Sequence, residues 1–146
     1  MVPPRWSRNN PIDLAGGETR DTIPAVLDLL AAHPGVDAVV HLGLGIQAGQ
    51  AQAFKSGPFY PDHGLERIAD FHDKQDARYA AEAAQASERH GTPVLSCTEL
   101  VTADRHYGNP GPLAVKQAGR LCYPSAHRAV RALRAMVDYA NYRKEL

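Results

Sequence analysis

Short apolar runs alternate with longer amphipathic segments along this chain, and this alternation restricts its fold more than any other feature. The runs that predict strands are Pro11–Leu14, Val36–Leu42, Thr92–Cys97 and Arg120–Tyr123. Between them, apolar residues at helical spacing predict helices over residues 20–32, 47–54, 65–89 and 113–118, and a last helix after Pro124. Strands that alternate with helices in this way favour right-handed crossovers and a mostly parallel sheet.

A chain of 146 residues is long enough for one such domain with one core. We therefore predict an α/β fold, a flavodoxin-like three-layer α/β/α sandwich around a mostly parallel sheet of roughly four or five strands. Residues 10–146 form the predicted domain, and residues 1–9 are interpreted as an arm or the remnant of a linker. Ligands of such sheets gather at the carboxyl ends of the strands.

The composition argues against several classes of function. Lys and Arg together number 16, as do Asp and Glu, so no net positive charge attracts nucleic acid or an anionic membrane. The longest nearly uncharged stretch, residues 38–54, is rich in glycine and glutamine and falls short of the ~20 apolar residues of a transmembrane helix. Cys97 and Cys122 lack disulfide-framework or zinc-ligand spacing, and no secretory signal is seen, which favours a cytoplasmic protein.

Gly16 and Gly17 join the first predicted strand to the first predicted helix, for which Thr19 or Asp21 is the expected N-cap. The N-terminus of a helix leaves backbone N–H groups unpaired and carries the positive end of the helix dipole, so it suits a phosphate. Neither the dinucleotide pattern nor the P-loop lysine is present. The alternative is therefore a tight strand-to-helix connection without a ligand.

Several stretches together resemble one family. They are Asn10–Leu14 with Gly16 and Gly17, His33–Val39, Gly91–Leu95, and Gly119–Ser125 with Arg128–Leu133. In order and spacing they look like the last flavodoxin-like (CoA-ligase) domain of the NDP-forming acyl-CoA synthetases, within the succinyl-CoA synthetase superfamily. The likeness covers almost the whole chain, although residues 47–64 and 104–111 are longer than the usual loops of the family.

The resemblance implies an enzyme that joins an acid to coenzyme A with ATP or GTP and Mg²⁺. A phosphohistidine in another flavodoxin-like domain would carry the phosphate, while a Rossmann-like domain binds CoA and an ATP-grasp domain binds the nucleotide. These domains, fused or separate, are the expected partners.

For this domain the resemblance implies a phosphate-holding role without a catalytic side chain, a metal or a cofactor of its own. By position the phosphate ligands would be Gly16, Gly17, Glu18 and Thr19, and the expected pocket-lining residues are Asp13, Gly43 and Gly45. Glu18 departs from what suits phosphate, so its carboxylate must point away. The isolated chain is expected to be inactive.

Two other interpretations stay open. The chain could be a free-standing, non-catalytic regulatory or assembly module of flavodoxin-like fold. It could also be a metal-dependent hydrolase, because Asp70, His72, Asp73 and Asp76 recur on one helix, although such residues more often form a solvated face.

Cys97 and three arginines of the last predicted helix have structural interpretations that need no ligand. Cys97 lacks a basic neighbour and is expected to be a buried thiol. Arg128, Arg131 and Arg134 lie opposite the apolar stripe of the last helix and predict a solvated face, or a docking surface for a neighbouring domain.

Overall fold

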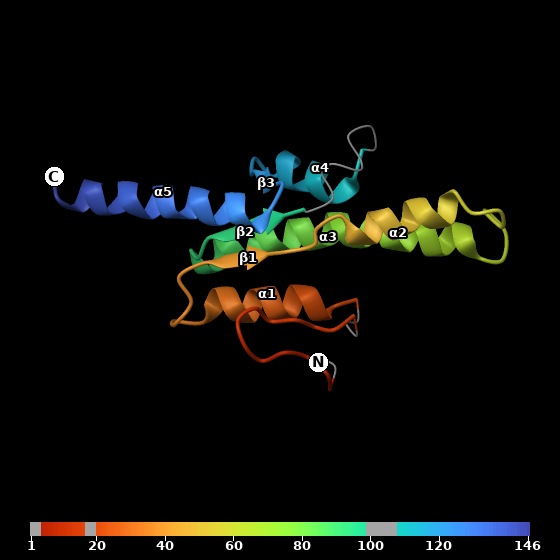
Figure 1. Ribbon diagram of the computed structural model, residues 1–146, viewed down its shortest axis with the longest axis horizontal. Coiled ribbons are helices and arrows are strands. Elements are labelled where there is room, and N and C mark those ends of the chain that lie inside the picture. Colours follow the sequence, from red (N-terminus) through yellow and green to blue (C-terminus); the bar gives the residue numbers. More distant parts are fainter. Residues whose placement is uncertain (1–3, 17–19, 99–107) are drawn as a thin grey trace.

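The computed structural model describes residues 4–16, 20–98 and 108–146. Its helices are α1 (Thr22–Ala32), α2 (Ile46–Lys55), α3 (Leu65–His90), α4 (Pro110–Gln117) and α5 (Ala126–Lys144), and its strands are β1 (Val39–His41), β2 (Val94–Cys97) and β3 (Cys122–Tyr123). The fold is α/β, as predicted, and strands alternate with helices in the expected order (Figure 1). No helix in the described ranges is long and apolar enough to cross a bilayer.

The sheet is parallel, in the order β1-β2-β3, and has three strands within the described residues, fewer than predicted. The predicted strand Pro11–Leu14 is not part of it. This segment makes a single antiparallel bridge, in which the Ser7 amide donates to the Asp13 carbonyl at 2.7 Å. Two local causes oppose pairing: Pro11 has no N–H, and the Asp13 carboxylate turns the chain by accepting from the Ala15 amide at 2.8 Å.

The side chains of the sheet alternate between two cores, as the period of a strand requires. Val39 and Val94 pack with Leu27 of α1 and with alanines of α3. On the opposite face, Leu95 and Cys97 pack with Ala129 of α5, and Val40 and Leu133 lie against this second cluster. Helices therefore cover both faces of the sheet, with α1 and α3 on one side and α5 on the other.

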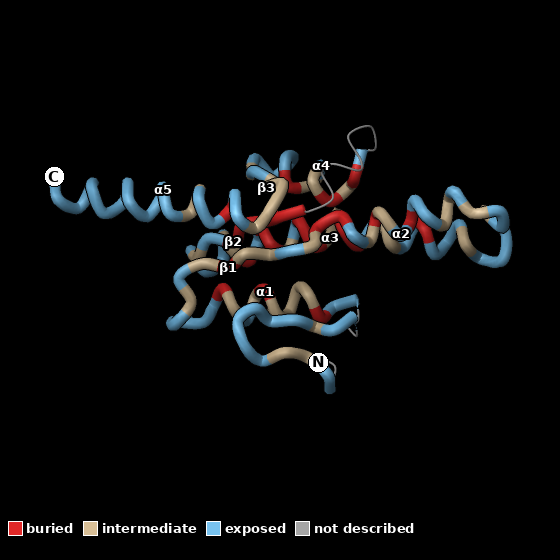
Figure 2. The backbone as a smooth tube through the Cα atoms, viewed as in Figure 1, coloured by how far each residue is buried: buried red, intermediate tan, exposed pale blue. Residues whose placement is uncertain are grey.

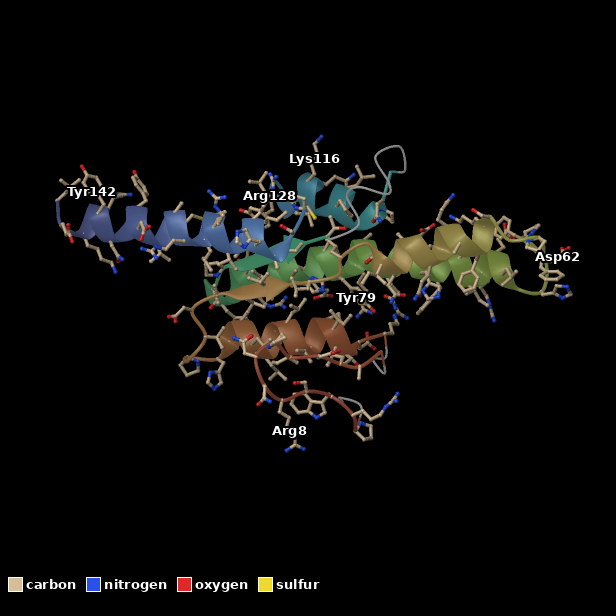
Figure 3. The ribbon with its side chains drawn as sticks, in the orientation of Figure 1. Arg8, Asp62, Tyr79, Lys116, Arg128 and Tyr142 are labelled. Carbon is tan, nitrogen blue, oxygen red and sulfur yellow. The ribbon has the colours of Figure 1, made fainter. Side chains whose placement is uncertain are left out.

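Two helical parts extend beyond the sheet in opposite directions (Figure 1). The antiparallel α2 and α3 form a hairpin with Asp62 near its tip (Figure 3). Beyond its first turns α5 is exposed along its length, and Ala129 is its buried residue (Figure 2). The Ser125 hydroxyl accepts from the Arg128 amide at 3.4 Å and so begins this helix.

Candidate functional site

The candidate site lies at Gly16, which precedes α1 in the chain. Gly16 has φ +66° and Ala15 has φ +55°, so the chain turns sharply after Asp13. Asp13 and Gly16 line a cleft of about 700 Å³ between the amino-terminal segment, α1 and β1. Gly17, Glu18 and Thr19, the other expected phosphate ligands, lie outside the described residues.

Among the described residues, the N-cap residue of α1 makes no side-chain capping hydrogen bond. Asp21 occupies the N-cap position, but its carboxylate makes no capping hydrogen bond and instead accepts from Arg78 of α3 at 2.5 Å. Arg78 also donates to the Arg20 carbonyl at 3.2 Å. The first turn of α1 contains Pro24, which has no N–H to donate, and the Arg78 guanidinium at this helix end is paired with the Asp21 carboxylate.

Sequence reasoning missed this role for Arg78. Its local pattern indicated an ordinary surface pair on α3, whereas the contact with Asp21 joins residues 57 positions apart. The tertiary packing of α1 against α3 creates the contact, and no motif in either segment signals it.

The second glycine turn, Gly43–Gly45, joins β1 to α2 and is closed by the protein itself. The buried carboxylate of Asp76 accepts from the Gly45 amide at 2.9 Å and from the Ala48 amide at 2.6 Å. Asn109 donates to the Gly45 carbonyl at 3.1 Å. Gly45 has φ +101°, and a Cβ there would lie 2.8 Å from Asn109 Nδ2, so the turn requires glycine.

Asp76 therefore acts as the N-terminal cap of α2 from a different helix. Burial raises the pKa of this carboxyl group, while its backbone N–H partners act in the opposite direction. Because the carboxylate already fills the anion position, the N-terminus of α2 is not open to phosphate.

His41, at the carboxyl end of β1, lines the cleft together with the ionisable residues Arg8 and Asp13. Burial lowers its pKa to about 4, so the imidazole is neutral at pH 7. Its Nδ1 is buried and has no hydrogen-bond partner. Leu42, which follows β1, and Ile46 of α2 line the same cleft.

The acidic residues of α3 are separated in space. His72 contacts Gln47 Oε1, Asp73 pairs with Lys55 at 2.6 Å, and Asp76 caps α2. Asp70 is exposed. Among the described residues, no three His, Cys, Asp or Glu side chains lie close enough together to hold a metal ion.

The remaining candidates lie away from the glycine turn. Cys97 is fully buried in the core beneath α5, and burial raises the pKa of the Cys122 thiol, which disfavours its thiolate form. Arg128 and Arg131 are exposed on α5, and Arg134 pairs with Asp138 on the same helix at 2.8 Å (Figure 3).

Comparison of the chain with protein-family models, with curated proteins and with solved structures finds no match in any of the three. Its function must therefore be inferred from the site.

Proposed function

We propose that residues 10–146 form the last flavodoxin-like domain of an NDP-forming acyl-CoA synthetase and hold the phosphate of a phosphohistidine at the N-terminus of α1. The observation that carries the proposal is the glycine turn at Gly16, which precedes α1 in the chain; the N-cap residue of this helix, Asp21, pairs with Arg78 and makes no capping hydrogen bond. The parallel sheet between helical layers agrees with such a domain. The reaction is proposed from the resemblance of the sequence segments described above, since no family model matches the chain.

The chemistry of the clamp is electrostatic. N–H groups at a helix end stabilise a phosphoryl oxyanion without reorganising during transfer. Arg78 pairs with the carboxylate of Asp21 and so reduces the repulsion that this negative charge would exert on the phosphate. This role needs no nucleophile, base or metal ligand from this domain.

The other components of the reaction belong to partner domains, fused or separate. A second flavodoxin-like domain would bring the phosphohistidine, and CoA- and nucleotide-binding domains would bring coenzyme A and ATP or GTP with Mg²⁺. The isolated chain is therefore expected to be inactive. A thioester formed from acid, CoA and ATP by the purified chain alone would contradict the proposal.

The first experiment is to measure the size of the native protein by immunoblotting lysate of its source cells with an antibody against this chain. A band much larger than 15.8 kDa is expected, and that polypeptide should consume ATP only when both acid and CoA are present. A band at the size of the chain, without a captured partner, would favour the free-standing module instead.

The second experiment compares Gly16→Val with Gly119→Val in that polypeptide. Both glycines have positive φ, +66° and +70°, and open space where a Cβ would lie, so both substitutions impose similar backbone strain. Gly16→Val should abolish phosphohistidine-dependent turnover, whereas Gly119→Val should retain it. Equal loss in both variants would refute a specific role for the turn.

A further inference from the structure

We infer that the outer end of α5, residues 136–144, docks an amphipathic helix of a partner domain, and that this helix carries carboxylates at one end of its apolar stripe. The docking site lies on a different element from the glycine turn at Gly16, so it does not depend on the proposed function. It is also tested without acid, CoA or ATP.

The first observation is that the apolar stripe of α5 continues past the part of the helix that packs on the sheet. Ala129 and Leu133 belong to the core cluster around Leu95. Met136 and Val137 follow Leu133 at helical spacing, so they lie on the same side of the helix. They are nevertheless 48% and 46% exposed, and Figure 1 shows α5 extending beyond the sheet here. An apolar surface of the kind that forms the core is therefore open at the outer end.

The second observation is the exposure of the outer end as a whole. From Arg134 to Lys144 every residue of α5 is exposed (Figure 2). A helical segment of this length is only marginally stable in water unless one of its faces is packed. The sheet supplies this packing to the first turns of α5, and a partner would supply it to the outer end.

The third observation is the charge of α5, which indicates the chemistry of the partner. The chain as a whole has no net charge, but this helix is basic. Its only carboxylate, Asp138, is already paired with Arg134 at 2.8 Å. The cations of the helix are Arg128, Arg131, Arg134, Arg143 and Lys144.

Two of these cations end the apolar stripe. Arg143 follows Met136 by two helical turns and Lys144 follows Val137 by the same interval, so all four share one side of the helix. Neither cation forms an ion pair with another residue in the described part of the chain. A helix that covers the stripe therefore meets two unpaired cations at its end, and carboxylates at that position would pair with them.

A second copy of α5 fits this site less well, because its stripe ends in the same cations. In a parallel pair of helices, Arg143 and Lys144 of the two copies would face each other. In an antiparallel pair centred on Ala140, they would lie against Met136 and Val137. Neither arrangement pairs a cation with a carboxylate.

An anionic surface such as a bilayer or a nucleic acid also fits less well. The stripe faces the side of α5 on which the sheet and α1 lie, because Ala129 and Leu133 pack on the sheet (Figure 1). A flat bilayer on that side would collide with the rest of the domain. A nucleic acid would pair with the cations but leave Met136 and Val137 uncovered. A single helix, about 10 Å wide, is narrow enough to lie beside the outer end.

The test uses a fluorescein-labelled peptide of about 18 residues, with leucines at helical spacing and glutamates beside them at one end. With the intact chain, its anisotropy should rise to saturation and its helicity should increase. The first control peptide has the same composition in an order that spreads the leucines around the helix. The second keeps the leucines and replaces every glutamate with lysine. Neither control should bind.

Two matched double variants locate the site. Arg143→Glu with Lys144→Glu reverses the cations of the stripe and should weaken binding of the acidic peptide by at least about tenfold. Arg128→Glu with Arg131→Glu makes the same change of charge on the opposite side of α5 and should leave binding within about threefold. The lysine peptide should bind the first variant, and this gain of binding cannot result from a loss of folding.

Several outcomes would overturn the inference. They are the absence of saturable binding, equal binding of the peptide with spread leucines, and a lysine peptide that does not bind the charge-reversed variant. Equal weakening in the two double variants would also overturn it, because it would indicate a general attraction between opposite charges. Binding of phosphatidylserine vesicles that is lost in Val137→Asp would assign the outer end to a membrane instead.

Discussion

Replacing Asp76 with alanine should be among the most destabilising single changes in this chain. The carboxylate accepts from the amides of Gly45 and Ala48 at 2.9 and 2.6 Å, in a position that is 1% exposed. Alanine leaves these two donors buried without partners, at about 1–3 kcal/mol each. Removing the carboxylate recovers part of its own desolvation cost, so we expect a net loss of about 2–4 kcal/mol in the free energy of unfolding.

The assay is urea unfolding followed by far-UV circular dichroism, with Asp70→Ala as the control. Asp70 is exposed on the same helix, and its replacement should change stability by less than about 0.5 kcal/mol. Asp76→Asn should fall between the two, because its carbonyl oxygen still accepts while its amide group needs partners of its own. Equal stability of Asp76→Ala and Asp70→Ala would refute the capping role.

Three other predictions concern His41, Gly111 and Arg78. The free energy of unfolding should fall by an amount on the order of 3 kcal/mol as the pH drops from about 6.5 to about 4, because the unfolded chain protonates His41 before the folded chain does. A series of urea titrations at different pH values measures this fall, and the variant His41→Leu should show a smaller one over the same pH range. Gly111→Ala should lower the free energy of unfolding by about 1–3 kcal/mol, since the new Cβ would lie 3.0 Å from Leu44 Cγ. Gly108→Ala should lower it less, because the nearest atom to its Cβ, Leu113 Cδ1, would lie at 3.5 Å. Thermal unfolding of the two variants measures the difference. In the intact polypeptide Arg78→Met should slow phosphohistidine-dependent turnover, and Arg89→Met, which breaks the exposed pair with Asp28, should not.

The pH series has a second contribution of opposite sign. Burial raises the pKa of Asp76, so the folded chain binds that proton more readily than the unfolded chain and gains stability as the pH falls through the folded pKa. Repeating the series with Asp76→Asn separates the two groups. A loss at acidic pH that persists unchanged in His41→Leu would show that another group is responsible.

Helices were the most predictable part of the fold from sequence. The predicted helices at residues 20–32 and 65–89 correspond to α1, Thr22–Ala32, and α3, Leu65–His90, because their apolar and alanine residues repeat at the helical period. Strand ends were less predictable. The apolar run Val36–Leu42 gives a strand only over Val39–His41, since pairing with β2 and not composition sets its length.

The segment Pro11–Leu14 shows the limit of local pattern. Its composition predicts a strand, but a strand forms only where a neighbour offers hydrogen bonds, and within the described residues β1 lies across the cleft from it. The candidate site, too, has one part that sequence predicts and one part that it does not. The glycine turn was visible in sequence, whereas the contacts of Arg78 with Asp21 and of Asp76 with Gly45 join distant residues and depend on how helices pack.

The α2–α3 hairpin is held by buried hydrogen bonds at its base, whereas the end formed by the connecting loop is exposed. At its base Asp76 fixes the first turn of α2, and further out Lys55 and Asp73 form a partly exposed pair. Phe59, in the connecting loop, is 65% exposed. Local opening should therefore begin at the loop and stop at Asp76, so the turns of both helices nearest the loop can fray and re-form without disturbing the sheet.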